Sequence, residues 1–134
     1  MTGWQDRPHA PAPGARLCDA AQVPAGGALG VEFGSGPRAF RLVLARCEAG
    51  WRAYLNECPH FRVRLDAEPG RFCVYEIDGR LDLMCAHHTA MFHLADGACY
   101  DGPCAGGRLE AVPLVERDGL LCVGSAAGGE LPHP

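Results

Sequence analysis

Two short stretches of the chain each pair a cysteine with a histidine. In ECPHFRV, Cys58 and His60 are separated by one proline, and in MCAHHTAMF, Cys85 and His88 are separated by two residues. Thiolates and imidazoles are ligands for zinc and for iron–sulfur clusters. On ligand type alone, the four side chains suit either kind of metal centre.

The spacing of these residues bears on the kind of metal. Structural zinc sites usually pair cysteine with cysteine and histidine with histidine, whereas each stretch here supplies one of each. This division suits a two-iron cluster in which one iron binds both thiolates and the other both imidazoles. A zinc-stabilised structural or interaction module without redox activity remains the alternative. His87 competes with His88, because Cys85-x-His87 would repeat the spacing of the first stretch.

Strands are the elements that must position these residues. The apolar runs are short, partly β-branched and interrupted by Gly and Pro, a pattern typical of strands rather than helices. The first strands are expected at Arg16–Cys18, Leu29–Phe33, Ala39–Ala45 and Trp51–Asn56.

The second half of the chain contains two signals for hairpins. Asp-Gly between extended runs is the strongest short hairpin signal, and it occurs at Asp78-Gly79 and at Asp118-Gly119. The segment CAHHTAMFHLADGACYDGPCAGG is expected to be a loop, with a tight turn at Ala95-Asp96-Gly97. The result is an all-β domain with one Cys/His loop on either side of a hairpin.

Length and composition restrict the possible functions. The 134 residues suit one domain, and the net charge of -4 gives no basic surface for nucleic acid. No apolar run is long enough to span a membrane, and the N-terminal residues lack the pattern of a secretory signal. We therefore expect a cytoplasmic protein. In that reducing compartment, eight cysteines favour metal binding or buried thiols over disulfides.

The motifs are similar to those of a known family. CPH followed by CAHH resembles the Rieske [2Fe–2S] signature, Cys-x-His then Cys-x-x-His. Three further segments resemble parts of Rieske-type ferredoxins: RLCDAAQVPAGGALGVEF, WRAYLNECPH and FHLADGACYDGPCAGGRLEAVPL. The last of them contains a CxxGPC motif similar to that of small stand-alone bacterial Rieske proteins. The resemblance covers residues 15–123.

This resemblance implies a fold and a domain organisation. The fold would be a Rieske-type antiparallel β-sandwich, with a cluster-binding subdomain formed by the two Cys/His loops and the intervening hairpin. The domain would span 15–123, with the cluster-binding part at about 57–105. Residues 1–14 would form a flexible N-terminal arm and residues 124–134 a flexible C-terminal tail.

The resemblance also implies the cofactor, one Rieske-type [2Fe–2S] cluster per chain, and its ligands. These are Cys58, His60, Cys85 and His88. Thr89 replaces the glycine that usually follows the last ligand, and its Cβ would be strained if φ there is positive. His93 is expected to be a surface or strand-end histidine.

Several residues predict a low reduction potential by comparison with respiratory Rieske proteins. Those proteins have a disulfide-forming cysteine at the positions of Val63 and His87, and hydroxyl residues at those of Ala90 and Phe92. Hydrogen bonds to the cluster sulfurs raise the potential. Their absence predicts a potential in the lower half of the Rieske range.

The other cysteines are expected to be buried thiols. Cys99 and Cys104 flank YDGP, where a disulfide is sterically possible although the compartment favours packed thiols. Small buried hydrophobic roles are expected for Cys18, Cys47, Cys73 and Cys122.

The function implied by the resemblance is one-electron transfer. The chain would be a ferredoxin-like carrier, or an electron-transfer subunit of a larger assembly, rather than a catalyst on its own. Its partners would be a reductase and a terminal oxygenase or reductase, and no oligomeric state is predicted. Electrons would leave through His60 and His88, with water excluded by Phe61, Phe92 and Pro103.

Overall fold

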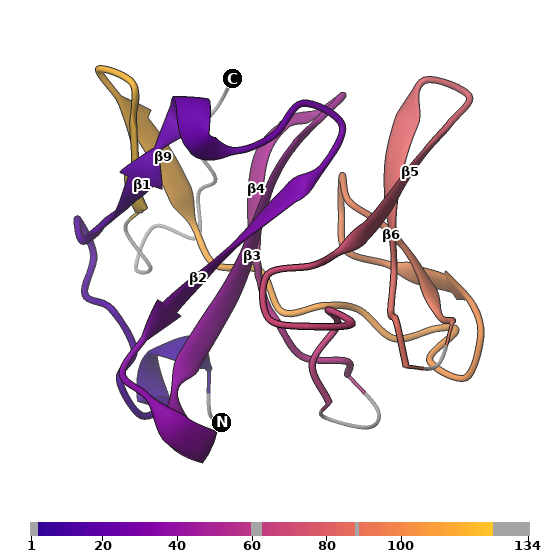
Figure 1. The fold of residues 1–134 in the computed structure, drawn as a ribbon, viewed down its shortest axis with the longest axis horizontal. Coiled ribbons are helices and arrows are strands. Elements are labelled where there is room, and N and C mark those ends of the chain that lie inside the picture. The colour runs from indigo at the N-terminus through magenta and orange to yellow at the C-terminus, as the bar shows by residue number, and fades with distance from the viewer. Residues whose placement is uncertain (1–2, 60–62, 88, 125–134) are drawn as a thin grey trace.

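The computed structural model describes residues 3–59, 63–87 and 89–124 (Figure 1). The described residues form strands and three short 3-10 helices, η1 (Trp4–Asp6), η2 (Ala20–Gln22) and η3 (Gly36–Arg38). The strands are β1 (Arg16–Asp19), β2 (Ala28–Phe33), β3 (Phe40–Cys47), β4 (Gly50–Leu55), β5 (Cys73–Ile77), β6 (Arg80–Met84), β7 (Met91–His93), β8 (Cys99–Asp101), β9 (Leu114–Arg117) and β10 (Leu120–Val123). None of the helices in this part of the chain is long and apolar enough to cross a membrane.

The strands form three antiparallel sheets, as expected for the all-β class. The orders are β1-β10-β9, β2-β3-β4 and β5-β6-β7-β8. In Figure 1 the hairpin of β5 and β6 lies on the right, and the central strands β3 and β4 separate it from β1 and β9 on the left. This separate four-stranded sheet belongs to the predicted cluster-binding subdomain.

The sequence of β3 explains why both faces of the central sheet are covered. Successive side chains of a strand point to opposite faces. Leu42 and Leu44 join the apolar core shared with β9 and β10, whereas Val43 and Ala45 join the core shared with β6 and β7. A strand buried on both faces has an almost continuous apolar sequence, here LVLA.

Tyr54 connects the central sheet to the segment that follows β7 in the four-stranded sheet. It lies on β4, is 2% exposed, and its hydroxyl donates a hydrogen bond to the Leu94 carbonyl at 2.6 Å. Burial is the main cause of the raised pKa of this hydroxyl, so Tyr54 stays protonated and keeps donating this bond.

Both predicted hairpins are present. Asp78 and Gly79 have φ values of 52° and 78°, and Asp118 and Gly119 have values of 52° and 81°. Positive φ at both central residues defines a type I′ turn, whose twist matches that of the flanking strands. The turn predicted at Ala95–Gly97 also forms, since the Gly97 N–H donates to the His93 carbonyl at 2.7 Å.

The structure differs from the sequence analysis in the segment 85–107. This segment was expected to be a loop, but it contains β7 and β8, which extend the β5-β6 hairpin into a four-stranded sheet. Each of the two strands has only three residues. Such a length is too short to show the alternation from which strands are predicted.

Within the arm expected to be flexible over residues 1–14, the described residues from Gly3 onward pack on the domain. Trp4 is 5% exposed and its ring meets that of Phe40 edge to face, with centroids 6.2 Å apart. Arg7 forms a bidentate ion pair with Glu57, the shorter contact being 2.8 Å. Burial of a large indole ring explains why this Pro-rich segment packs on the domain. In the predicted tail, residues 125–134 lie outside the described residues.

Candidate metal centre

The first candidate ligand loop follows β4. Cys58 is fully buried, and its N–H donates to the Val63 carbonyl at 2.8 Å, which closes the loop over residues 58–63. His60 and Phe61 lie outside the described residues. The described residues on the two sides of 60–62, Cys58 and Val63, therefore lie next to each other.

Two buried polar residues hold the base of this loop. Asn56 accepts a hydrogen bond from the Leu65 N–H at 2.7 Å and donates to the Asp66 carboxylate at 3.1 Å. Asp66 also accepts from Arg64 and from the Gly70 N–H. Burial raises the pKa of Asp66, but these hydrogen bonds outweigh it and lower the pKa below its ordinary value.

Sequence analysis missed this pair. Asn56 ends the strand-like run before the first ligand loop, and Asp66 follows that loop closely. Their positions on either side of the loop are the sequence signal from which the pair could have been found. Both are almost fully buried, at 6% and 2% exposure, and buried polar side chains need hydrogen-bond partners. Their bonds with each other and with Leu65 fix both ends of the loop.

The second candidate ligand loop follows β6. Cys85 is fully buried, its N–H donates to the Ala90 carbonyl at 2.8 Å, and its carbonyl accepts from the Thr89 N–H at 2.9 Å. His88 lies outside the described residues. Thr89 has a φ of 57°, the left-handed conformation that favours glycine. Thr89 therefore has the positive φ at which its Cβ is expected to be strained.

The two loops contact each other directly. The Ala86 N–H donates to the Leu65 carbonyl at 3.0 Å, and His87 Nε2 lies 3.2 Å from the Asp66 carbonyl oxygen. The His87 side chain is exposed. Each loop thus supplies one buried thiol to the same region.

A third segment covers the two loops. Gly102 packs on the second loop so closely that a Cβ there would lie 2.7 Å from the Ala90 Cα. Cys104 reaches the first loop, with its sulfur 2.9 Å from the Cys58 sulfur. Pro103, one of the predicted shielding residues, is exposed between these contacts, while Phe92 is fully buried beneath them.

All eight cysteines lie in the described part of the chain, and none forms a disulfide. The alternative of a disulfide between Cys99 and Cys104 is therefore not realised. Burial is the largest cause of the raised pKa of Cys99, whose thiol donates to the Asp101 carbonyl at 3.3 Å. Of the other cysteines, Cys18 and Cys47 are buried, and Cys73 and Cys122 are partly buried.

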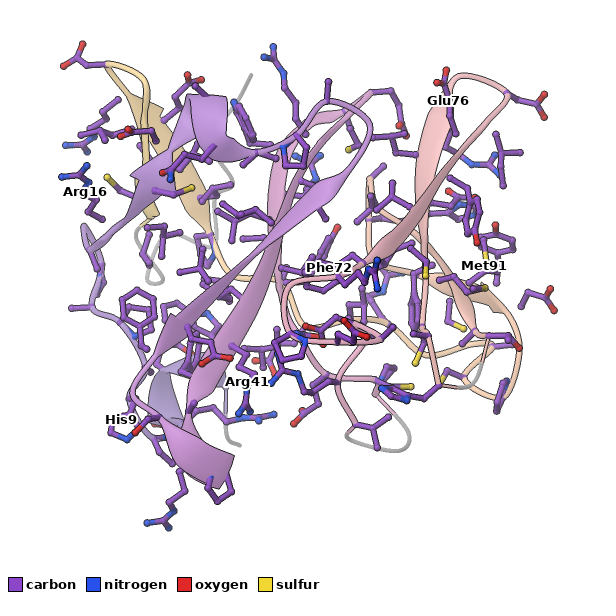
Figure 2. All side chains as sticks on the ribbon, in the orientation of Figure 1. His9, Arg16, Arg41, Phe72, Glu76 and Met91 are labelled. Atoms are coloured by element: carbon purple, nitrogen blue, oxygen red, sulfur yellow. The ribbon has the colours of Figure 1, made fainter. Side chains whose placement is uncertain are left out.

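The donor set fits a metal centre that requires thiolates. Cys58 and Cys85 are completely buried in one apolar core, on two loops that hydrogen-bond to each other. Figure 2 shows sulfur atoms gathered below β5 and β6, on the side of the molecule where Met91 is labelled. The described residues alone contain no group of three or more His, Cys, Asp or Glu side chains that could hold a metal. The described part of the candidate site therefore consists of the two cysteines.

A second polar cluster lies on the four-stranded sheet. Asp82 is fully buried and accepts hydrogen bonds from the Tyr100 hydroxyl at 2.6 Å and from Arg80, with His93 Nδ1 at 3.1 Å. Burial raises the pKa of Asp82, but these contacts outweigh it and lower the pKa. The contacts of Asp82 therefore join β6, β7 and β8. His93 is the last residue of β7, in agreement with the strand-end position predicted for it.

Comparison with known proteins agrees with this geometry. The sequence model of the Rieske [2Fe–2S] domain family matches residues 15–116. No curated protein matches the chain.

Solved structures with similar folds include the Sphingomonas yanoikuyae B1 ferredoxin, with 24% identity, a TM-score of 0.62 and coverage of 84% of this chain and 98% of that one. A chain of the complex of reduced oxygenase and oxidized ferredoxin in carbazole 1,9a-dioxygenase has 20% identity and a TM-score of 0.57, covering 81% and 98%. A protein assigned as an NADH-dependent nitrite reductase small subunit from Mycobacterium tuberculosis has 22% identity and a TM-score of 0.59, covering 81% and 91%. At these identities the similarity establishes the fold.

Proposed function

The chain belongs to the Rieske [2Fe–2S] domain family, and from this premise we propose that it transfers single electrons as a ferredoxin-like carrier or an electron-transfer subunit. The resident cofactor of this family is a [2Fe–2S] cluster, which accepts and returns one electron when bound. The observation that carries the proposal is the burial of Cys58 and Cys85 in one core, on two closed loops that contact each other.

Four side chains are proposed as ligands, two from each loop. The thiolates of Cys58 and Cys85 would bind one iron, and the imidazoles of His60 and His88 the other. The two cysteines are completely buried, whereas neighbouring His87 and Thr89 are exposed. This arrangement supports a thiolate-bound side that faces the protein and an imidazole-bound side that faces the partner, so that His60 and His88 are the route for the electron.

Water exclusion is the second task of the chain. Phe92 and Ala90, at 0% exposure, lie behind the second loop, and the segment with Gly102 and Cys104 covers both loops. Burial of the thiolates lowers the local dielectric constant and limits hydrolysis of the metal–sulfur bonds. Pro103 lies at the exposed edge of this cover.

We propose a reductase as electron donor and a terminal oxygenase or reductase as acceptor. Structures of similar fold include a ferredoxin complexed with an oxygenase and a nitrite reductase small subunit, and both descriptions fit such a role. Contacts with such partners should be weak and transient. Cytoplasmic location is proposed as well, since eight cysteines without a disulfide suit a reducing compartment.

A low reduction potential is the finer part of the proposal. The positions that carry hydroxyls in respiratory Rieske proteins are Ala90 and Phe92, and neither side chain can donate a hydrogen bond. Val63 and His87 likewise provide no loop-to-loop disulfide. A spectroscopic redox titration tests this point, and a midpoint above about +150 mV, within the range known for Rieske centres, would contradict it.

Metal and sulfide analysis of the purified protein tests the main proposal. Two irons and two acid-labile sulfides per chain, with an EPR signal after reduction, would support the cluster. A colourless protein with one zinc per chain would instead establish the zinc-stabilised module. Cys58→Ser tests the ligand assignment, because an unchanged absorbance and EPR spectrum in that variant would exclude Cys58 as a ligand. Cys122→Ser, a partly buried cysteine on β10, is the matched control.

A further inference from the structure

Cys104 places a second thiol against a candidate ligand. Its sulfur lies 2.9 Å from that of Cys58, and both side chains are completely buried. Cys99 belongs to the same core, but its thiol donates to the Asp101 carbonyl at 3.3 Å. The direct sulfur contact with Cys58 is therefore made by Cys104.

We propose that Cys58 and Cys104 are an oxidation-sensitive pair, which forms a disulfide when Cys58 is not bound to iron and then blocks cluster assembly until it is reduced. The blocking step rests on the proposed function, because it requires Cys58 to be a cluster ligand. Formation of the disulfide rests only on the contact between the two sulfurs.

The pair needs little movement to form the bond. A disulfide has an S–S distance of about 2.05 Å, less than 1 Å shorter than the present separation. Cys104 lies between exposed residues, Pro103 and Ala105, in a segment with glycines at positions 102 and 106 that both have positive φ. Cys104 therefore lies in a turn that follows β8 and not in a strand.

Hydrogen peroxide is the oxidant that suits a fully buried pair, because it is small. One cysteine thiolate attacks the peroxide, the O–O bond breaks, and the thiolate becomes a sulfenic acid as hydroxide leaves. The second thiol then attacks the sulfenic sulfur, an S–S bond forms, and water leaves. In total, two thiols and one peroxide give one disulfide and two waters, and the pair loses two electrons and two protons.

Metal binding and disulfide formation exclude each other at Cys58. An iron-bound thiolate uses the sulfur electron pair that the oxidation consumes, so the loaded protein is protected. Without iron, oxidation stops at a reversible disulfide, whereas a cysteine without such a neighbour proceeds to irreversible sulfinic acid. Cys104 thereby preserves the ligand Cys58 for later assembly of the cluster.

The test uses the full chain, freed of metal by a chelator without oxygen and then treated with hydrogen peroxide. Peptide mapping should show a link between Cys58 and Cys104 with the loss of two hydrogens. Assembly with ferrous iron and sulfide should fail after peroxide and recover after a thiol reductant. Cys99→Ala should behave like the wild type.

Two variants of Cys104 complete the test. Cys104→Ala, and Cys104→Ser as the variant of similar volume, should add oxygen atoms at Cys58 instead of forming the link. Cluster assembly should then stay impaired after reduction. A link between other cysteines, no link at all, or equal recovery in wild type and variants would overturn the proposal. So would a link between Cys58 and Cys104 that leaves assembly unimpaired.

The two proposals fail in different ways. If the protein as purified contains no two-iron centre, the proposed function fails, while the peptide map still reports on the pair. If the centre is present but peroxide links no Cys58 to Cys104, only the oxidation-sensitive pair is rejected.

Discussion

Gly102 and Ala90 are in such close contact that a Cβ on Gly102 would lie 2.7 Å from the Ala90 Cα. Gly102 also has a φ of 97°, which side chains rarely adopt. Gly102→Ala should therefore lift the covering segment off the second ligand loop, with a strain of about 1–3 kcal/mol before the clash is counted. We expect cluster occupancy, measured as iron and sulfide per chain, to fall severalfold.

Gly106→Ala is the matched control for this variant. Gly106 has a φ of 93°, almost the same as Gly102, but a Cβ there would have no atom within 4 Å. Gly106→Ala therefore has the same backbone strain as Gly102→Ala but no clash with a neighbouring residue, so the cluster should be retained. Equal occupancy in the two variants would mean that the contact with Ala90 does not position the covering segment.

The left-handed conformation of Thr89 predicts that glycine is more stable than alanine at this position. Its φ of 57° costs an ordinary L-residue about 1–2 kcal/mol, whereas glycine adopts it without a steric penalty. Thr89→Ala removes the same hydroxyl and methyl groups but keeps the Cβ. Thr89→Gly should therefore be more stable than Thr89→Ala by about 1 kcal/mol, after the larger entropy of unfolded glycine is included.

Urea unfolding followed by circular dichroism measures this difference. The comparison is between the two variants, because both lose every contact of the threonine side chain beyond Cβ. If Thr89→Ala proves as stable as Thr89→Gly, the left-handed conformation costs nothing at this position.

Asp66 should make stability depend on pH. Although burial raises the pKa of this carboxyl, hydrogen bonds from Arg64, Gly70 and Asn56 hold it below the value of about 3.9 expected in the unfolded chain. The stabilisation is therefore complete above about pH 4 and is lost as pH falls through the lower, folded-state pKa. Asp66→Asn should cost about 2 kcal/mol at pH 7.

The pH series gives the decisive comparison for Asp66. The free energy of unfolding, measured from pH 7 down through the folded-state pKa of Asp66, should converge for wild type and Asp66→Asn at the acid end. Asp118→Asn, at an exposed hairpin turn, should follow the wild type throughout. A constant gap between wild type and Asp66→Asn across this range would show that the charge of Asp66 is not what stabilises the loop.

The hairpins and the ligand loops could be predicted from the sequence because their signals are local. Asp78-Gly79 and Asp118-Gly119 determine turn type through the backbone preferences of two residues. The Cys/His spacing within each loop is equally local. The contact between the loops could be anticipated only through the resemblance, since the Ala86–Leu65 hydrogen bond joins residues far apart in sequence.

Features that depend on tertiary packing were not visible in the sequence. Trp4 occurs in a Pro-rich segment with no periodic pattern, and only the position of Phe40 makes it part of the core. The link between Asn56 and Asp66 requires the first loop to return on itself. Likewise, the sequence places Cys104 near Cys99, whereas the fold brings its sulfur into contact with that of Cys58 from another loop.

Ala90 offers a direct test of the proposed low potential. In respiratory Rieske proteins this position has a serine hydroxyl near a cluster sulfur, and here it is a fully buried alanine. Ala90→Ser adds a hydrogen-bond donor that stabilises the reduced state, which has more negative charge on sulfur.

A tenfold change in the reduction equilibrium of a one-electron couple corresponds to about 59 mV. We expect the midpoint to rise by a shift of about this size, whereas Ala105→Ser, on the exposed segment, should leave it unchanged. An unchanged or lower midpoint for Ala90→Ser in the EPR-monitored titration would show that a missing hydroxyl at this position does not set the potential.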